Sequence, residues 1–581
     1  MSGSRYVLVG LSRIAVRVAD VLAARGDEVV VVPEPSGGDT AAETLLRHRV
    51  RVMEPTPDRE EALRAAGVDG ADCLLAVSDD DLENLHAALA AGAVAPDVPL
   101  VIRSFEPVLV DRLARSVRLR RAYSVSALAA PAFVAAALGE DLLATLRLGE
   151  DDISLCRLEV RPGAPIAGAT AAEVKADSGC AVVAHDDGSG WRPCAPVERI
   201  TEGERILIGG PLRLALLLAK RVSPVLGKDR ARPAPGLLHR LRDRRAERKA
   251  LHAGLRANTL LPAAAAVLVG LLLITVIVFA VALHLNPIDA IYFAVSTALG
   301  NATLDQNEAW LKAFGIGAMV AGGALLGVVF SYLAALATAE RLEEQMGRRA
   351  RRLSNHVVLA GLGTVGYRIE HLLSDLEIPL AVIERSPDDR FVATVARRTP
   401  VVIGDARLPE DLMRVGVEDA ACFVACTEDE LTNVAACLQA QRQNPGLRTV
   451  ARVFDEELGG RIQTTLGIDA AVSGTRAATG AFVSAAVDER APRTLHLGGV
   501  AFVAVRFEPT VPLDAGEIDR WRGRGLRVLA FSRGNGPVRA ASELDGGLGP
   551  GDAAIVAGPE AAVRETLFGA ARPGIADRLR P

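Results

Sequence analysis

Apolar and polar positions divide this chain into two alternating parts and a strongly apolar middle. From residue 5 to 221 and from 354 to 570, short apolar runs alternate with amphipathic stretches, which is typical of strands and helices in turn. Between them, Ala257–Leu283 and Ala313–Ala339 are uncharged runs of 27 residues each. Because a bilayer core needs about 20 helical residues, the two runs predict a pair of transmembrane helices.

The segment between the two runs begins at Pro287 and reads as a short helix followed by a loop of small residues that ends near Asp305. A helix, a re-entrant loop and a second helix form the pore of a tetrameric cation channel. The alternative interpretation, two buried core helices of a soluble protein, fits the length and the flanks less well.

Charge around the apolar middle is asymmetric. Residues 220–256 hold 12 Lys and Arg against 3 acids, 341–352 holds five Arg, and 284–311 holds neither Lys nor Arg. The positive-inside rule then predicts a multi-pass protein of the plasma (inner) membrane with both termini cytoplasmic. The start of the chain shows no signal peptide, and seven scattered cysteines without CxxC spacing predict reduced thiols and no metal site.

The chain repeats itself. The strand run Arg5–Val9 followed by Gly10 corresponds to 356–360 followed by Gly361, and 67–84 matches 416–433 without gaps at an offset of 349. Strands alternating with helices imply a parallel, doubly wound sheet in each copy. The predicted fold class is therefore α/β plus membrane α, with two Rossmann-like units, each carrying a small α+β lobe, on either side of a two-helix pore unit.

The resulting domain boundaries run in chain order along the whole sequence. We expect a first Rossmann-like domain (1–140) with its C-terminal lobe (141–221), followed by a basic linker (222–256). The two-helix pore domain (257–339) and a linker from the inner helix (340–353) come next. A second Rossmann domain (354–490) and its C-terminal lobe with the tail (491–581) complete the chain.

The second copy carries a nucleotide-binding motif between a strand and a helix. Its turn is Gly361-Leu362-Gly363-Thr364-Val365-Gly366, and Glu384 closes the next strand. The glycines allow a tight turn and close approach of a pyrophosphate to N–H groups at a helix N-terminus, while the acid can accept from a ribose hydroxyl. We expect a dinucleotide or an adenine nucleotide here; the alternative is a structural turn with an empty cleft.

Four further residues complete the predicted cofactor site. Arg385 leaves room for a phosphorylated ribose, although Glu384 favours the unphosphorylated form. Asp405, followed by Ala406, is expected at the carboxyl end of a strand, where ligands bind in such sheets. Arg452 either reaches phosphate or is a buried ion-pair partner, and the sequence leaves both open.

The first copy has lost this motif. Ser12 and Ala15 stand at the positions of the second and third glycines, and Pro33 stands where the second copy has Glu384. A side chain at position 12 crowds the pyrophosphate path, so this copy is expected to serve assembly rather than binding.

Taken together, a two-helix unit joined to HVVLAGLGTVG, GDA, CTEDELTN and ARV resembles the RCK (regulator of K⁺ conductance, TrkA-N type) channels and the nucleotide-binding subunits of Trk/Ktr potassium systems. The resemblance implies a homotetramer whose eight RCK units form a cytoplasmic ring that responds to ligand. The chain departs from most such channels because one unit precedes the apolar middle.

The loop also lacks the TVGYG filter of potassium channels. Its Gly-Asn step is similar to the Castor/Pollux-like ion channels, and this resemblance makes Thr297, Ala298, Leu299, Gly300 and Asn301 the candidate filter. In the second apolar run, Gly322 and Gly323 are a candidate gating hinge, with helix packing as the plainer alternative.

The sequence therefore predicts a ligand-gated cation channel, with potassium as a candidate ion, controlled by NAD(H) or an adenine nucleotide (ATP or ADP) bound to the second Rossmann domain. The alternative is a non-conducting, membrane-anchored nucleotide sensor that regulates a separate transporter. The sequence shows no proton donor or substrate-site constellation, so we expect no enzyme activity, no catalytic residues and no nucleic-acid partner.

Overall fold

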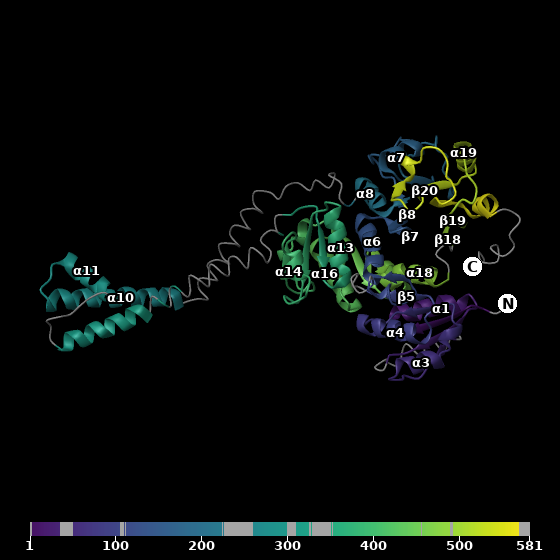
Figure 1. Cartoon of the computed structure of the whole chain (residues 1–581). Coiled ribbons are helices and arrows are strands. Elements are labelled where there is room, and N and C mark those ends of the chain that lie inside the picture. Colours follow the sequence, from purple (N-terminus) through teal and green to yellow (C-terminus); the bar gives the residue numbers. More distant parts are fainter. Residues whose placement is uncertain are drawn as a thin grey trace. The chain divides into compact units, whose positions relative to one another are not determined.

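The computed structural model describes most of the chain in two compact units. The described residues are 3–34, 50–104, 110, 112–223, 225, 260–298, 309–324, 327, 330, 350, 353–454, 456–487 and 492–568. The first unit joins residues 1–227 to 347–581, and the second comprises 228–346 (Figure 1).

The first copy of the repeat opens with a parallel sheet of six strands. Its strand order is β3-β2-β1-β4-β5-β6, the doubly wound arrangement. Apolar residues cover both faces of the central strands, since four of the five residues of β1 are buried. The elements are β1 (Arg5–Val9), α1 (Arg13–Ala24), β2 (Glu28–Val32), β3 (Arg51–Val52), α3 (Arg59–Ala65), β4 (Cys73–Ala76), α4 (Asp81–Val94), β5 (Leu100–Arg103) and β6 (Leu119–Tyr123).

The second copy builds the same sheet, in the order β14-β13-β12-β15-β16-β17. All of its pairings are parallel. The prediction of two Rossmann-like units is confirmed. The elements are β12 (Val357–Ala360), α13 (Thr364–Asp375), β13 (Leu380–Glu384), α14 (Val392–Val395), β14 (Val401–Ile403), α15 (Pro409–Arg414), β15 (Cys422–Ala425), α16 (Glu430–Gln443), β16 (Arg448–Val453), α17 (Glu456–Leu466) and β17 (Ala470–Ser473).

Each sheet is followed by a long helix and a small lobe with a five-stranded antiparallel sheet. The first set is α6 (Val125–Leu138), β7 (Asp141–Leu148), β8 (Asp151–Glu159), α7 (Ala171–Ser178), β9 (Ala181–Asp186), β10 (Arg192–Pro193), β11 (Arg205–Pro211) and α8 (Leu212–Val222). The second set is α18 (Gly474–Val487), β18 (Arg493–Leu497), β19 (Val500–Phe507), α19 (Ala515–Gly523), β20 (Arg527–Ser532), β21 (Val538–Ala540), β22 (Ala553–Pro559) and α20 (Glu560–Val563).

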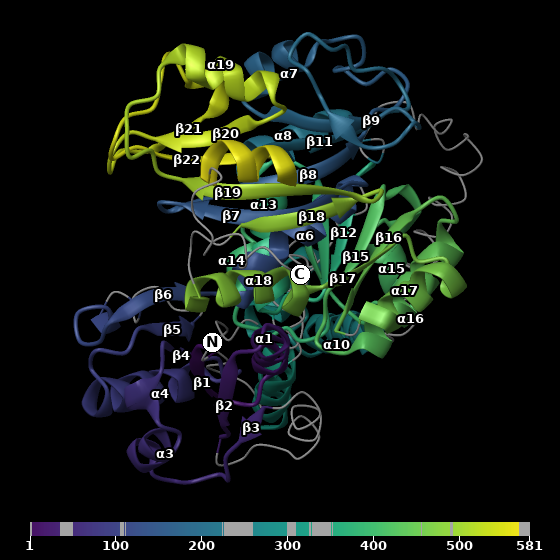
Figure 2. The same ribbon diagram turned by 90° about the vertical axis from the view of Figure 1, so that its right-hand side faces the viewer.

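The two lobes share one apolar core. Trp191 and Leu207 of the first lobe lie in the same buried cluster as Phe502, Leu529 and Ile555 of the second. The two antiparallel sheets therefore face each other, and Figure 2 shows the strands of one lobe lying over those of the other.

The long helices cross between the copies. Phe133 and Val134 of α6 share a buried cluster with Ile369 and Leu373 of α13, the helix that follows the glycine turn of the other copy. In the opposite direction, Phe482 of α18 belongs to the buried cluster of α1. Each long helix thus packs on the helix that follows the glycine turn of the other copy.

The second unit is a small helical assembly. It contains α10 (Leu260–Ala282), α11 (Pro287–Ala298) and a helical stretch at 309–324. Phe279 contacts Phe293 and Phe314 edge-to-face, with ring centroids 5.2 and 6.0 Å apart, and this aromatic contact holds the three helical segments together.

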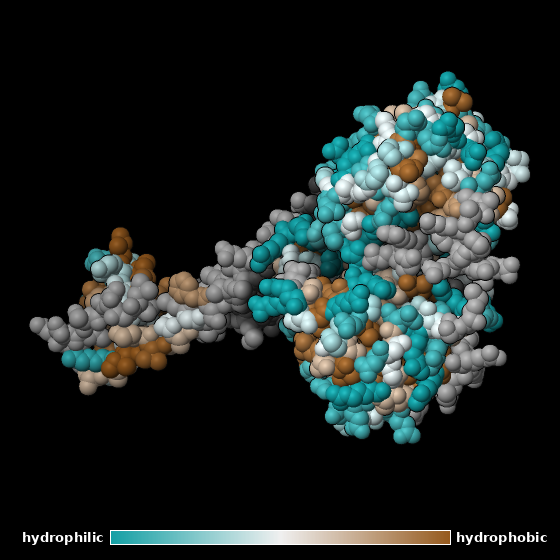
Figure 3. Space-filling model, turned by 45° about the vertical axis from the view of Figure 1, so that its right-hand side comes forward, coloured by the Kyte–Doolittle hydropathy of each residue, from teal (hydrophilic) through white to brown (hydrophobic). Residues whose placement is uncertain are grey.

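Large apolar side chains nevertheless remain exposed on this second unit (Figure 3). Eight of them are Leu273, Ile274, Ile277, Val281, Ile288, Ile291, Ile316 and Val320. An exposed apolar surface of this kind marks an interaction site in a folded protein.

The described residues include no helix that is both long enough and apolar enough to cross a membrane. This finding overturns the predicted localisation, a multi-pass protein of the plasma (inner) membrane with two transmembrane helices and cytoplasmic termini. The predicted pore unit at 257–339 is likewise not supported. Of the second apolar run, only 313–324, 327 and 330 are among the described residues.

Candidate functional site

The glycine turn after β12 is built as the sequence predicts. Gly361 has φ +97°, and a Cβ added there would lie 2.9 Å from Cγ2 and 3.1 Å from the backbone nitrogen of Thr427. A Cβ on Gly366 would collide with the carbonyl oxygen of Gly361. Both positions therefore require glycine, the first for its backbone conformation and the second for close approach of helix and strand. Thr427, after β15, was not singled out from the sequence.

Gly363 is the open position of the turn. It is the N-cap residue of α13, no side chain caps the helix there, and a Cβ added to it would meet nothing within 4 Å. Thr364 and Val365 then begin the helix, and Val365 is buried in its core. An uncapped helix N-terminus presents N–H groups and a positive partial charge, which together suit an anion such as phosphate.

Glu384 lies at the end of β13, beside this turn. Its carboxylate accepts hydrogen bonds from the N–H of Leu362, at 2.6 Å, and from the N–H of Ser386, at 3.0 Å. The side chain therefore holds the turn in place. A carboxylate offers about four acceptor positions, so Glu384 can still accept a hydrogen bond from a hydroxyl group. The neighbouring Arg385 is exposed.

Asp405 follows β14 at the same sheet edge. Its carboxylate accepts hydrogen bonds from the side chain of Arg407, from Nε at 3.0 and 3.2 Å and from Nη2 at 2.6 Å. The hydrogen bonds from Arg407, aided by Arg385, lower the pKa of Asp405 below its ordinary value. Ala406 is buried behind it. Asp405 is thus ionised and lies just beyond the carboxyl end of β14.

Arg452, in β16, makes no ion pair within the part of the chain that the structure describes. Its Nη1 lies 3.4 Å from the carbonyl oxygens of Cys426 and Thr427, and its buried Nε makes no hydrogen bond to the described residues. Burial lowers the pKa of its guanidinium. It also lies 5.0 Å from the centroid of the Phe454 ring. Arg452 therefore supports the β15 edge of the site and carries positive charge there.

The turn of the first copy carries the side chain of Ser12 at the position that corresponds to Gly363. Ser12 accepts a hydrogen bond from the N–H of Ala15, at 3.2 Å, and its hydroxyl donates to the carbonyl oxygen of Val77. The side chain is buried and caps α1. It occupies the place that Gly363 leaves open in the second copy, and it satisfies an N–H that a phosphate would otherwise bind.

The predicted filter and hinge lie in the second unit, whereas the glycine turn lies in the first. Thr297 is buried, and its hydroxyl donates to the carbonyl oxygen of Phe293 at 2.8 Å. Ala298 ends α11, and Leu299, Gly300 and Asn301 lie outside the described residues. Gly322 and Gly323 lie within the helical stretch at 309–324, which shows no break at either glycine. The filter and the hinge stay predictions.

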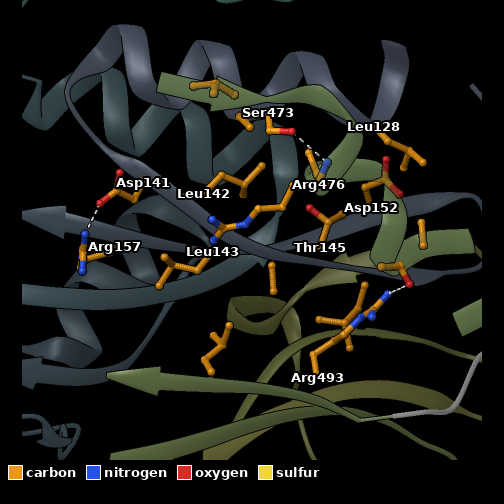
Figure 4. Close-up of a pocket in the computed structure, with 18 of the residues that line it drawn as sticks. Leu128, Asp141, Leu142, Leu143, Thr145, Asp152, Arg157, Ser473, Arg476 and Arg493 are labelled. Atoms are coloured by element: carbon orange, nitrogen blue, oxygen red, sulfur yellow. Dashed lines mark hydrogen bonds and ion pairs between the residues drawn. The ribbon is translucent and has the colours of Figure 1, made fainter. Parts of the chain in front are cut away.

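A separate cavity of about 470 Å³ lies between the first lobe and the second copy (Figure 4). It is lined on one side by β7 and β8 and on the other by β17, α18 and β18. Arg476 and Arg493 lie along it, and Asp141 pairs with Arg157 at its rim. Glu140 also lines it, and burial raises the pKa of that carboxyl to about 8. Sequence reasoning did not find this cavity because its walls come from segments more than 300 residues apart.

Comparison with known proteins identifies the repeated domain. The family model of the TrkA-N domain matches residues 6–120 and 357–474, so the chain contains two TrkA-N domains. The model matches the first copy as well as the second, although the turn of the first copy has lost two glycines.

Three curated relatives match parts of the chain. They are Potassium channel protein 1 of Methanocaldococcus jannaschii (26% identical over 115 residues, 19% of this chain and 34% of the relative), the Trk system potassium uptake protein TrkA of Mycobacterium tuberculosis (32% over 120 residues, 21% and 54%) and K(+) efflux antiporter 2, chloroplastic, of Arabidopsis thaliana (27% over 179 residues, 31% and 14%). The matched segments thus span about half or less of these relatives' own lengths.

Among solved structures, the GsuK RCK domain is similar over 98% of this chain and 95% of its own, with 14% identity and a TM-score of 0.48. The human SLO3 gating ring is similar over 96% and 99%, with 11% identity and a TM-score of 0.38.

Proposed function

We propose that this chain is a nucleotide-sensing regulator of cation transport. The observation that carries the proposal is the open, uncapped start of α13 at Gly363, with Glu384 fixing the turn before it. NAD(H) or an adenine nucleotide such as ATP or ADP would place its phosphates at this helix N-terminus. The carboxylate of Glu384 would accept a hydrogen bond from a ribose hydroxyl. The positive charges of Arg385 and Arg452 would partly balance the charge of the phosphates.

The signal would travel through α13. Its far end is held by the first copy, because the ammonium group of Lys220 donates to the carbonyl oxygens of Leu376, at 2.5 Å, and Glu377, at 3.3 Å. Its side packs on α6, which leads directly into the first lobe. A nucleotide that binds one arrangement of α13 more tightly than another would shift the whole unit, with a coupling of about 1–3 kcal/mol in typical cases.

The regulated event in this proposal is movement of a cation such as K⁺. The names of the three curated relatives all concern potassium transport, and this supports the choice of ion. We further propose a homotetramer that brings eight TrkA-N domains into a ring. The exposed apolar side chains of the second unit supply surface that such an assembly would cover. In this proposal the nucleotide acts as a signal and is not turned over.

Hydrogen exchange with and without NADH or ATP tests this function. The proposal predicts slower exchange at the start of α13 and, in the same experiment, a change in α6 of the other copy. A change confined to the turn would leave a binding site without transmission and would contradict a regulatory role. Turnover of the nucleotide by the purified protein would contradict the proposed role as a signal.

A further inference from the structure

The first lobe brings together three side chains that the sequence separates. His185 lies at the end of β9 next to Asp186, Cys194 follows β10, and Glu198 lies in the turn after it. One ligand atom from each, a ring nitrogen, the thiol sulfur and a carboxylate oxygen, lies within 4.8 Å of the other two. The antiparallel pairing of β9 with β10 sets His185 opposite Arg192 and Ala184 opposite Pro193, so Cys194 lies diagonally across the pair from His185.

The imidazole of His185 is the feature that points to a ligand. Its side chain is 1% exposed, and among the described residues its Nε2 makes no hydrogen bond, although Glu198 Oε1 lies 3.1 Å away. Its other nitrogen, Nδ1, lies 3.3 Å from Oε2 of the buried Glu204. A carboxylate on one ring nitrogen fixes the ring and its tautomer, and leaves the other nitrogen free to bind a metal ion.

Cys194 is buried and Glu198 is held in place. Burial, with Glu198 nearby, raises the pKa of the Cys194 thiol to about 12 in the metal-free protein. The Oε2 of Glu198 accepts the N–H of Ala195 at 3.0 Å, so this carboxylate is ordered by its own turn. A bound cation lowers the pKa of a coordinating thiol enough to deprotonate it outright, which is the state required for a bond to metal.

We propose that His185 Nε2, Cys194 Sγ and the Glu198 carboxylate form a binding site for a divalent transition-metal ion of the zinc class. Nitrogen, thiolate and carboxylate are the ligands that zinc takes, usually in a tetrahedral arrangement. Zn–N and Zn–S bonds of about 2.1 and 2.3 Å at tetrahedral angles put the ligand atoms about 3.5 Å apart. The observed spacing therefore needs only small side-chain rotations, and water takes the fourth position.

The guanidinium of Arg192 already contacts this cluster, and it has a second carboxylate partner. Arg192 pairs with Glu198 Oε1, and its Nη2 lies 3.1 Å from an oxygen of Asp187. Its side chain is half-exposed. When metal binds Glu198, Arg192 keeps the ion pair with Asp187 and gives up the one with Glu198. The alternative is that His185 only contacts Glu198 and Glu204, with no metal bound, and the experiment separates the two.

The test uses the full-length, untagged protein, stripped with chelator and free of nucleotide. Zn²⁺ is titrated in competition with a chromophoric chelator, and Co²⁺ is titrated while the absorption spectrum is recorded. We expect one ion per chain and, with Co²⁺, a thiolate-to-metal charge-transfer band. Cys194→Ser removes that band, and Cys194→Ser and His185→Gln each weaken Zn²⁺ binding at least tenfold. Cys180→Ala, at another buried cysteine of the same lobe, leaves both unchanged.

The absence of Zn²⁺ binding by the wild-type protein overturns the proposal. So does tight binding without a charge-transfer band, because the thiolate is then not a ligand. Equal affinity in Cys194→Ser also overturns it. The wild-type spectrum distinguishes these outcomes even if a variant fails to fold.

Discussion

Arg13 places its guanidinium carbon 3.5 Å from the centroid of the Phe454 ring. Arg13 is the first residue of α1 in the first TrkA-N domain, and Phe454 follows β16 in the second, so this stacking joins the two glycine-turn ends of the domains. Arg452 approaches the same ring at 5.0 Å. The pair therefore sets positive charge from both copies around one aromatic side chain.

This contact should contribute measurable coupling between the two domains. A cation–π contact is worth about 1 kcal/mol when it is partly shielded from water. In a double-mutant cycle with Arg13→Ala and Phe454→Leu, we expect an interaction energy of about 0.5–1 kcal/mol in the free energy of unfolding measured with urea. Strictly additive effects of the two substitutions would show that the stacking contributes nothing.

Gly363→Asp should abolish nucleotide binding and preserve the fold. Position 363 has space for a side chain and an ordinary φ of −63°, so the new residue fits the free protein. Its carboxylate would cap α13 and repel phosphate from the same N–H groups. We expect affinity for NADH or ATP to fall at least a hundredfold by isothermal titration calorimetry.

The matched control for this change is Gly460→Asp, in α17 of the same domain. Position 460 is exposed and also has open space for a Cβ. It adds the same charge away from the turn and should leave affinity within about twofold of wild type. Equal loss in both variants would point to a general charge effect and not to a site at Gly363.

Glu140 should make stability fall as pH rises. It is 3% exposed, its Oε2 accepts the N–H of Glu159 at 3.2 Å, and burial raises the pKa of its carboxyl to about 8. Between the ordinary value of about 4.3 and pH 8, the folded protein binds more protons than the unfolded protein. The contribution of Glu140 to the free energy of unfolding is therefore fully present below about pH 4 and is lost as pH rises through 8.

Glu140→Gln should remove this pH dependence. At pH 8 we expect the variant to be more stable than wild type by on the order of 2 kcal/mol, and at pH 5 the difference should shrink markedly. Thermal unfolding across this pH range measures it, with Glu159→Gln, at an exposed neighbour, as the control. A constant difference at every pH would show that Glu140 does not titrate in this window.

Glu370 shows the opposite pH behaviour. This buried carboxylate of α13 accepts from Arg398 Nε at 3.0 Å, Thr399 Oγ1 at 2.6 Å and Ser374 Oγ at 3.0 Å. Burial alone would raise its pKa, but the hydrogen bonds outweigh burial and hold the pKa below the ordinary value. Its contribution is present at neutral pH and is lost as pH falls through the lowered pKa.

Glu370→Gln should therefore destabilise the protein by about 2 kcal/mol at pH 7, since a buried charged hydrogen-bond network loses its acceptor. The penalty should shrink as pH falls through the lowered pKa of the wild-type carboxyl. Urea unfolding at pH 7 and at a series of acidic pH values measures this change. Glu377→Gln, at an exposed position just beyond the end of the same helix, should have little effect, and an equal loss there would contradict the role of the buried network.

The sequence predicts local structure well where local pattern decides it. The strand at Arg5–Val9 has the predicted bounds. The offset of 349 also correctly pairs Asn84 with Asn433, each of which donates to the carbonyl oxygen of the arginine in the next strand. Glycine spacing also locates the turn, because the steric demands at Gly361 and Gly366 act within one strand–helix connection.

Features that depend on distant segments were not predictable in this way. Three tertiary contacts leave no periodic signal in the sequence. They are the packing of α6 on α13, the stacking of Arg13 on Phe454 and the approach of His185 to Cys194. The membrane prediction was wrong: a long uncharged run is typical of a transmembrane helix, but the described residues form no helix that could cross a membrane. In the described structure, part of that apolar surface is used by Phe279 and its aromatic neighbours for helix packing.

The number of nucleotides bound per chain is the measurement on which the nucleotide-sensor proposal depends most. Equilibrium dialysis of the full-length protein with radiolabelled NADH or ATP should show one saturable site per chain, because Gly363 leaves the second turn open and Ser12 closes the first. Two equivalent sites per chain would contradict the role given to Ser12. The absence of saturable binding of either nucleotide would contradict the proposal that the start of α13 senses nucleotide.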